Sequence, residues 1–366
     1  MATIILRHIY KKIGKINILK DVSLEAGDKN VLALTGPHSC GKTMILRLIA
    51  GLETPSKGEE LFDDKRVNSL SCAKRDAAFI FDDFALYPKM TAYENIAFGL
   101  RNKKLSKREI VVIISQIAKD FDIEHCLGKL PQYLNATQKL AVAIARALVK
   151  EKKVILFDEP AFLINPQEKI KMRNVLSRYQ KERGFTLIYA ASDPLEALAW
   201  SNNVCLLKDG QVVCNVSSKD AYASPINKFA FDFLQGQAAN CFKVGVVKTE
   251  EGFYLSDGTF EIALGGDSNA QLTNFIDKQV DLCINSGDIY NKDVSFESPS
   301  SNCLKAIVEQ IFPQGDKQYI YANTGKNFFT ASMSKDSNVA AGKIVEFELN
   351  LKRAFLFNPQ DGQRIL

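Results

Sequence analysis

The sequence predicts an α/β core that carries a phosphate-binding loop and a helical insertion, followed by a domain built from small β-barrels. Three observations support this fold class. Residues 36–43 match the pattern G-x-x-x-x-G-K-[ST], apolar strands alternate with helices up to about residue 233, and short strands separated by Gly, Asp, Asn and Ser turns follow. Because 366 residues exceed one ordinary hydrophobic core, we place the α/β core at residues 1–238 and the β-rich domain at residues 239–366. The helical insertion in the core is predicted at about residues 91–148.

The phosphate loop has the flanking elements that such a loop requires. Lys29–Thr35 predicts a short apolar strand before the loop, and Met44–Ala50 predicts a helix after it. The N-terminal amides and the dipole of that helix would add to an anion site. A chance glycine-rich turn is the alternative, and the order strand, loop, helix argues against it.

Each invariant position of the loop has a chemical reason. Gly36 and Gly41 let backbone N–H groups face phosphate oxygens, Lys42 reaches the outer phosphates, and the Thr43 hydroxyl ligates Mg²⁺. His38 and Cys40 occupy variable positions, so we predict that neither is catalytic. The loop residues predicted to contact nucleotide are Gly36, Pro37, His38, Ser39, Cys40, Gly41, Lys42, Thr43 and Met44.

A second apolar strand, Val154–Phe157, leads into two adjacent carboxylates. Asp158 at the strand end is placed to hold Mg²⁺ through water, and Glu159 is the candidate general base for an attacking water. Either carboxylate could instead cap the following turn. The phosphate loop elsewhere in the chain favours the metal and base roles.

Three longer segments resemble the ATP-binding subunits of ABC importers, in particular the maltose-type carbohydrate branch. Ala85–Leu100 is similar to the segment of that branch that contacts the membrane subunits. Val142–Leu148 resembles the helix after the family signature, and Leu356–Ile365 resembles the end of the C-terminal regulatory domain. The resemblance covers essentially the whole chain. It implies ATP and Mg²⁺ as cofactors, membrane-spanning partner subunits, a second nucleotide-binding subunit and a place on the cytoplasmic face of the membrane.

The family signature Leu-Ser-Gly-Gly-Gln is altered at residues 134–138, which read Leu-Asn-Ala-Thr-Gln. In the family this segment closes over the nucleotide held by the opposite subunit. The resemblance therefore assigns Asn135, Ala136, Thr137 and Gln138 to the nucleotide site, where the side chains of Ala136 and Thr137 should hinder a close backbone approach. The favoured alternative is that the segment survives as a helix start, because Asn135 caps about as well as serine.

Four further family positions are substituted. Asp82 stands where a glutamine senses magnesium, so it is a candidate metal contact with altered coupling. Ser192 replaces the switch histidine, and Asn165 replaces the aspartate of the inter-subunit loop. Ile13 aligns with the aromatic ring that stacks on adenine, although Tyr10 lies nearby.

These substitutions beside intact phosphate and magnesium motifs predict a degenerate nucleotide-binding subunit whose hydrolysis is slow. The chain could pair with a second copy of itself or with an intact ATPase subunit. The substitutions affect both the phosphate-loop side and the signature side of this chain, so pairing with an intact subunit would not confine them to one of the two nucleotide sites. The alternative is a non-catalytic ATP-binding scaffold or regulatory subunit. A Glu159→Gln change separates the two, since only a hydrolytic subunit needs the base.

Composition narrows the remaining classes. The first 238 residues carry 35 Lys and Arg against 26 Asp and Glu, and the remainder carries 12 against 16. Small β-barrels can bind oligonucleotides, but the acidic tail disfavours a nucleic-acid backbone as partner, and the sequence contains neither an internal repeat nor coiled-coil heptads.

No apolar run reaches the ~18 residues of a membrane helix, and the N-terminus lacks a signal-peptide layout. Eight scattered cysteines predict reduced thiols. The sequence does not identify the cargo.

Overall fold

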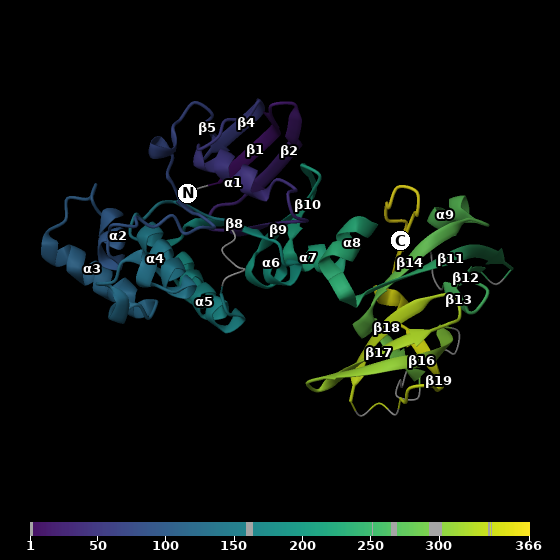
Figure 1. The fold of residues 1–366 in the computed structure, drawn as a ribbon. Coiled ribbons are helices and arrows are strands. Elements are labelled where there is room, and N and C mark those ends of the chain that lie inside the picture. Colours follow the sequence, from purple (N-terminus) through teal and green to yellow (C-terminus); the bar gives the residue numbers. More distant parts are fainter. Residues whose placement is uncertain are drawn as a thin grey trace. The chain divides into compact units, whose positions relative to one another are not determined.

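The computed structural model describes residues 3–158, 164–250, 252–264, 269–292, 302–335, 337 and 339–366. The chain divides into two compact units, Met1–Ala221 and Tyr222–Leu366. The boundary after residue 238, indicated by the pattern of elements and charge, stays a prediction. Each unit is described by itself below and can be followed in Figure 1.

The first unit is organised around a six-stranded sheet in which β10 pairs antiparallel with β9 and the other neighbouring strands pair parallel. Every residue of β3, β7 and β8 is buried, as in a parallel sheet covered on both faces. The predicted strands before the phosphate loop and before Asp158 are confirmed. In sheet order the strands are β10 (Gln211–Ser217), β9 (Asn203–Lys208), β3 (Val31–Thr35), β8 (Thr186–Ala191), β7 (Val154–Phe157) and β6 (Ala77–Ile80).

A second, antiparallel sheet covers this core with one apolar face. Its strand order is β2 (Ile16–Ala26), β1 (Ile4–Ile13), β4 (Lys57–Phe62) and β5 (Lys65–Arg66). Alternate residues of β1 and β2 are buried, and they share one hydrophobic cluster with β3 and with helix α1 (Lys42–Ala50). The predicted helix after the phosphate loop is therefore confirmed as α1.

Three helices occupy the region predicted as the insertion, and Figure 1 shows them together at one end of the first unit. They are α2 (Ala92–Phe98), α3 (Lys107–Asp120) and α4 (Ala136–Leu148). Each begins with a capping box, in which the cap side chain and the third helical residue satisfy each other's backbone N–H groups. The unit is completed by α5 (Pro166–Arg183), α6 (Pro194–Trp200) and the start of α7 (Ser218–Ala223). None of the helices in the described part of the chain is long and apolar enough to span a bilayer.

The second unit begins its regular structure with α8 (Lys228–Gln235) and contains two five-stranded sheets around one apolar core. This arrangement confirms the β-rich fold predicted for the tail. The first sheet has the order β13 (Glu261–Leu264), β12 (Gly252–Ser256), β11 (Ala239–Thr249), β14 (Gln279–Asn285) and β20 (Phe355–Phe357). The second has β15 (Ile289–Asn291), β19 (Ile344–Leu349), β16 (Cys303–Gln314), β17 (Lys317–Asn323) and β18 (Phe328–Ser334), and the short helix α9 spans Asn269–Leu272.

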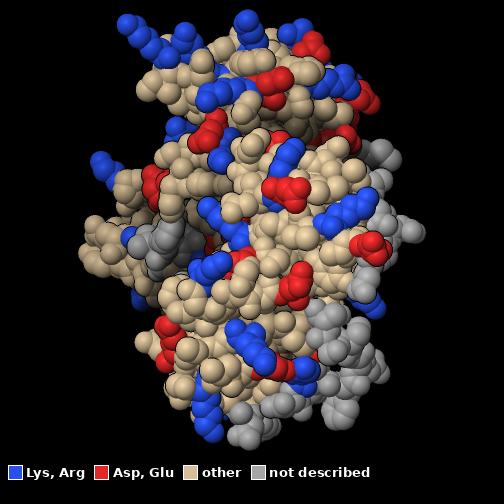
Figure 2. Space-filling view, turned by 90° about the vertical axis from the view of Figure 1, so that its right-hand side faces the viewer, with Lys and Arg blue, Asp and Glu red and all other residues tan. Residues whose placement is uncertain are grey.

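The charged surface carries both signs. Figure 2 shows Lys and Arg side chains interspersed with Asp and Glu on the face that it presents, without one continuous basic area. Interspersed charges of both signs are typical of a solvated face.

One cysteine pair corrects the expectation of uniformly reduced thiols. Cys241 on β11 lies directly opposite Cys283 on β14, and the two sulfur atoms form a disulfide across 42 residues of sequence. The expectation failed because isolated cysteines in a sequence carry no sign of their pairing, which strand register alone brings about.

The disulfide predicts a defined thiol count. Alkylation of the denatured, unreduced chain followed by intact-mass measurement should label six cysteines, and all eight after reduction. The double variant Cys241→Ala, Cys283→Ala should show six in both cases and serves as the control. Eight labelled cysteines before reduction would contradict the pairing.

Candidate functional site

The candidate site lies where four neighbouring parallel strands end. The phosphate loop follows β3, Ser192 follows β8, Asp158 follows β7, and Asp82 lies two residues after β6. The backbone N–H of Asp158 donates to the carbonyl of Ile80 at 2.9 Å, which ties the ends of β7 and β6 together. Because the strands are parallel, their carboxyl ends lie together, and all four segments lie at the same end of the sheet.

The two glycines of the loop are required by its geometry. Gly36 has φ of 144°, and a Cβ there would lie 2.2 Å from the carbonyl oxygen of Leu207. Gly41 has φ of 109°, and a Cβ would lie 2.6 Å from Cδ2 of Leu19. Both positions therefore combine a left-handed backbone with a close neighbour, which only glycine accommodates.

The invariant lysine and threonine of the loop make specific contacts. Lys42 is 8% exposed, and its Nζ donates to the carbonyls of Gly36 at 2.9 Å and Pro37 at 3.1 Å. The Thr43 hydroxyl donates to Oδ1 of the buried Asp158 at 3.0 Å, across 115 residues of sequence. The fold thus brings together the phosphate loop and the strand-end carboxylate that the sequence predicted as magnesium ligands.

The variable positions of the loop contribute less chemistry. Pro37, His38 and Ser39 are exposed, and Ser39 adopts a positive φ of 61°. Burial raises the pKa of the Cys40 thiol, although Lys42 opposes this rise. A thiol with a raised pKa is protonated at neutral pH, and the non-catalytic role of Cys40 stays a prediction.

Two of the substituted family positions, Asp82 and Asn165, use their side chains to bind nearby backbone N–H groups. Asp82 is exposed, and its Oδ1 accepts the backbone N–H of Asp83 at 3.0 Å. The residue after the half-buried Ser192, Asp193, caps α6 by accepting from Leu195 N at 2.8 Å. Asn165 similarly caps α5 by accepting from the backbone N–H of Gln167 at 2.9 Å.

The residues proposed for the nucleobase lie in the C-terminal part of β1, an inner strand of the antiparallel sheet. Ile13 is 51% exposed at the hairpin between β1 and β2, where it pairs with Ile16, and Tyr10 is 40% exposed on β1. Both side chains are accessible, and the assignment of Ile13 to the base stays a prediction. Glu159, the candidate general base, lies outside the described residues.

The altered signature segment is engaged within its own chain. The Asn135 side chain accepts from the backbone N–H of Gln138 at 2.8 Å, and Gln138 Oε1 accepts from Asn135 N at 3.1 Å. The Thr137 hydroxyl donates to Oε2 of Glu168 on α5. The role of Asn135 as a helix cap, favoured from the sequence, is confirmed, while contact of residues 135–138 with a nucleotide stays a prediction.

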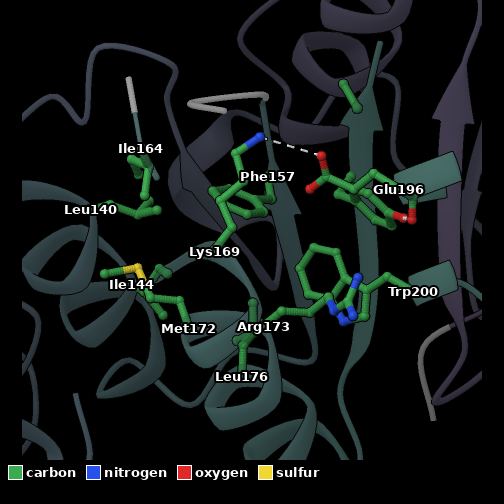
Figure 3. A pocket seen from close by; sticks show the side chains of 12 residues that line it. Leu140, Ile144, Phe157, Ile164, Lys169, Met172, Arg173, Leu176, Glu196 and Trp200 are labelled. Carbon is green, nitrogen blue, oxygen red and sulfur yellow. Dashed lines mark hydrogen bonds and ion pairs between the residues drawn. The ribbon is translucent and has the colours of Figure 1, made fainter. Parts of the chain in front are cut away.

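A small apolar cavity of about 40 Å³ lies behind the strand ends, with room for roughly three water molecules. Figure 3 shows Leu140 and Ile144 of α4 on one side and Trp200 of α6 on the other, with the ion pair between Lys169 Nζ and Glu196 Oε2 at 3.5 Å. Phe157, which lines the cavity, immediately precedes Asp158 in the sequence.

Trp200, the only tryptophan of the sequence, packs against residues of two of the four strands that lead to the site. Its ring lies 4.5 Å from that of Tyr189 on β8 and makes an edge contact with Phe157 on β7 at 6.2 Å. Its Nε1 donates to Oγ of Ser177 at 2.9 Å. The fluorescence of Trp200 is therefore expected to respond to changes in these two strands.

Three side chains near the site were missed from the sequence. Glu168 binds the signature segment, and the buried Arg146 and Asn95 bind the backbone of residues 84–91. Arg146 lay within a segment that resembles the family, but nothing in its spacing indicated a contact 61 residues away. Such contacts depend on the tertiary fold.

Known proteins share the sequence and the fold of this chain. A family model described as ABC transporter matches residues 19–162. The trehalose/maltose import ATP-binding protein MalK of Thermococcus litoralis is 30% identical, and the oligosaccharides import ATP-binding protein MsmX of Bacillus subtilis is 31% identical, each over 100% of both chains. The solved structure of CbiO1 from Clostridium perfringens, part of an ABC transporter complex, has a TM-score of 0.55 at 28% identity and covers 60% of this chain and 90% of that one. The chain belongs to the ABC transporter family, as one of its ATP-binding proteins.

Proposed function

We propose that this chain is the ATP-binding subunit of an ABC importer that takes up a carbohydrate. The observation that carries the proposal is the hydrogen bond of 3.0 Å between the hydroxyl of Thr43 and the carboxylate of Asp158. It joins the phosphate loop to the strand end that would complete a magnesium–nucleotide site. The full-length similarity to sugar-import proteins supplies the class of cargo.

The residues at the site fit Mg²⁺ and ATP. Thr43 and Asp158 offer the hard oxygen donors that Mg²⁺ prefers, and both would hold the ion. Lys42 now donates to two loop carbonyls and would exchange them for the outer phosphate oxygens. When bound, the ion neutralises charge on the β- and γ-phosphates.

Slow hydrolysis is the second part of the proposal. Glu159 would act as general base, whereas Ser192 cannot supply the positive charge of a histidine beside the γ-phosphate. The hydroxyl of Thr137 is engaged by Glu168, and Asn135 and Gln138 satisfy each other. A partner's nucleotide would therefore compete with contacts that the segment already makes.

The proposed partners follow from the same positions. Residues 85–100 would dock on membrane-spanning subunits at the cytoplasmic face of the membrane, and a second ATP-binding subunit would complete each nucleotide site. In a homodimer both sites would use the altered segment at residues 134–138. An intact partner subunit would give one site with a complete signature.

The first experiment measures nucleotide binding through Trp200. MgATP should change the emission of this single tryptophan because its neighbours Phe157 and Tyr189 lie on the strands that lead to the site. Lys42→Ala should weaken binding by about 10- to 100-fold, the effect of losing hydrogen bonds to charged groups. Trp200→Phe, assayed by equilibrium dialysis, should abolish the optical change and keep the affinity. An affinity of the Lys42→Ala chain for MgATP equal to that of the unmodified chain would overturn the proposal.

Purification of the complex through this chain from its native membrane, followed by intact mass spectrometry, tests the partners. We expect membrane-spanning subunits and either two copies of this chain or one copy with a different ATPase subunit. The same complex carrying Glu159→Gln should hydrolyse ATP more slowly. An unchanged rate would mean that this chain is a non-catalytic ATP-binding subunit.

A further inference from the structure

The loop between β6 and α2 holds an unfavourable backbone conformation. Phe84 and Ala85 are consecutive non-glycine residues with φ of 66° and 42°. Side chains disfavour this left-handed region, and two such residues in a row persist only where their surroundings impose the conformation. The same loop has Asp82 at its start and leads into the segment proposed to dock on membrane subunits.

Arg146 of helix α4 binds both of the residues that hold this conformation. Its Nη1 donates to the carbonyl of Ala85 at 2.8 Å, and its Nη2 donates to the carbonyl of Phe84 at 3.0 Å. The two oxygens belong to the two residues with positive φ. The guanidinium also lies over the ring of Tyr87, 5.5 Å from its centroid. One side chain therefore contacts three residues of the loop, Phe84, Ala85 and Tyr87.

Packing alone gives no reason for an arginine at this position. Its neighbours on α4, including Val142, Ala143 and Ala145, are buried and apolar, and Arg146 is itself buried. Burial lowers the pKa of the Arg146 guanidinium, and the nearby Tyr87 and Asp83 oppose this shift electrostatically. An aliphatic side chain would fill the space without the desolvation of a cation, so the charge is explained by the two carbonyls that it binds.

Asn95 of helix α2 holds the other half of the loop. Its Nδ2 donates to the carbonyls of Tyr87 at 3.2 Å and Met90 at 3.0 Å, and its Oδ1 accepts the N–H of Tyr87 at 2.8 Å. The ring of Tyr87 packs against Phe98 at 4.6 Å. The side chains of Asn95 on α2 and Arg146 on α4 thus hold the loop from two helices.

We propose that Arg146 is a positioning residue that joins helix α4 to residues 84–87, so that displacement of the helix moves the loop with it. Helix α4 starts at the altered signature segment, where Asn135 is its cap, and Arg146 lies ten positions after Ala136 along the helix. The guanidinium therefore transmits the position of the nucleotide-facing end of α4 to the partner-facing loop. The transport consequence rests on the proposed docking role of residues 85–100.

Hydrogen exchange of the full chain directly tests the connection that Arg146 makes between helix α4 and residues 84–87. Arg146→Met should raise exchange of the amides at residues 84–90 by about 10-fold or more, the factor expected from losing two hydrogen bonds to a charged donor. Arg146→Lys should give a smaller rise, because one ammonium cannot bind two carbonyls as a planar fork does. The matched control is Arg183→Met, since Arg183 also donates to a carbonyl of α4, that of Leu148 at 2.8 Å, without touching the loop.

An unchanged exchange rate at residues 84–90 in both Arg146 variants, or an equal rise in Arg183→Met, would overturn the proposal. If Arg146→Met does not fold, the exchange rate of Arg146→Lys alone tests the proposal.

A second test uses the purified complex. Arg146→Lys should keep KM for MgATP within about twofold and lose most of the stimulation of ATP hydrolysis by transported solute. A changed KM with full stimulation would also contradict the positioning role. A wild-type complex without membrane subunits would refute the docking proposal alone, because the exchange result does not depend on it.

Discussion

Restoring the family signature should raise ATP hydrolysis by about 10- to 100-fold. The variant combines Asn135→Ser, Ala136→Gly, Thr137→Gly and Ser192→His. Bare glycine backbone admits a close approach of the γ-phosphate, and removal of the Thr137 hydroxyl frees the segment from Glu168. The histidine adds a donor that can carry positive charge, and one such donor at a developing charge is worth about 10²–10³ in rate in other enzymes.

Steady-state release of phosphate by the purified complex measures this effect. The same four changes in a Lys42→Ala background should remain inactive, which excludes a contaminating ATPase. Two glycines in the first turn of α4 cost about 1 kcal/mol each at most, so the fold should survive. A rate equal to that of the unmodified complex would show that the altered signature and Ser192 do not limit hydrolysis, and the proposal of reduced activity would then be wrong.

Arg75→Met should lower the free energy of unfolding of the first unit by about 3–5 kcal/mol. Arg75 is 2% exposed and forms an ion pair of 2.7 Å with Glu60, which is 1% exposed. Its Nη1 also donates to the carbonyls of Leu48 at 2.6 Å and Ile49 at 3.0 Å, at the C-terminal end of α1. Burial already raises the pKa of Glu60 against the opposing effect of Arg75. Removal of the guanidinium would leave the buried Glu60 carboxylate without its ion-pair partner. It would also leave the carbonyls of Leu48 and Ile49, near the end of the helix that follows the phosphate loop, without their donor.

Urea unfolding followed by Trp200 fluorescence reports on this unit. The matched control is Arg66→Met, since Arg66 makes an exposed ion pair of 3.4 Å with Glu59 in the same sheet. Exposed pairs contribute little, so the control should unfold close to the wild-type midpoint. Equal midpoints for Arg75→Met and Arg66→Met would contradict a structural role for the buried pair.

Local patterns were predictable wherever the chemistry is contained in neighbouring residues. The phosphate loop, the strands on either side of the site and the cap at Asn135 follow from spacing, apolar runs and capping preference. A strand, a tight loop and a helix are all defined within a few residues, so the sequence determines them without knowledge of the rest of the chain. Assignments of nucleotide contact at Ile13 and at residues 135–138 remain predictions, because a partner subunit and a ligand complete them.

The sequence by itself determined the class of the protein and the chemistry of its phosphate loop. Only the tertiary structure decided which distant residues meet: Thr43 with Asp158, Cys241 with Cys283, Thr137 with Glu168, and Arg146 with the carbonyls of Phe84 and Ala85. Strand order and register set these pairs, and both arise from packing of the whole core. A lone cysteine or arginine in a sequence has many possible partners, and burial beside one of them selects the interaction that forms.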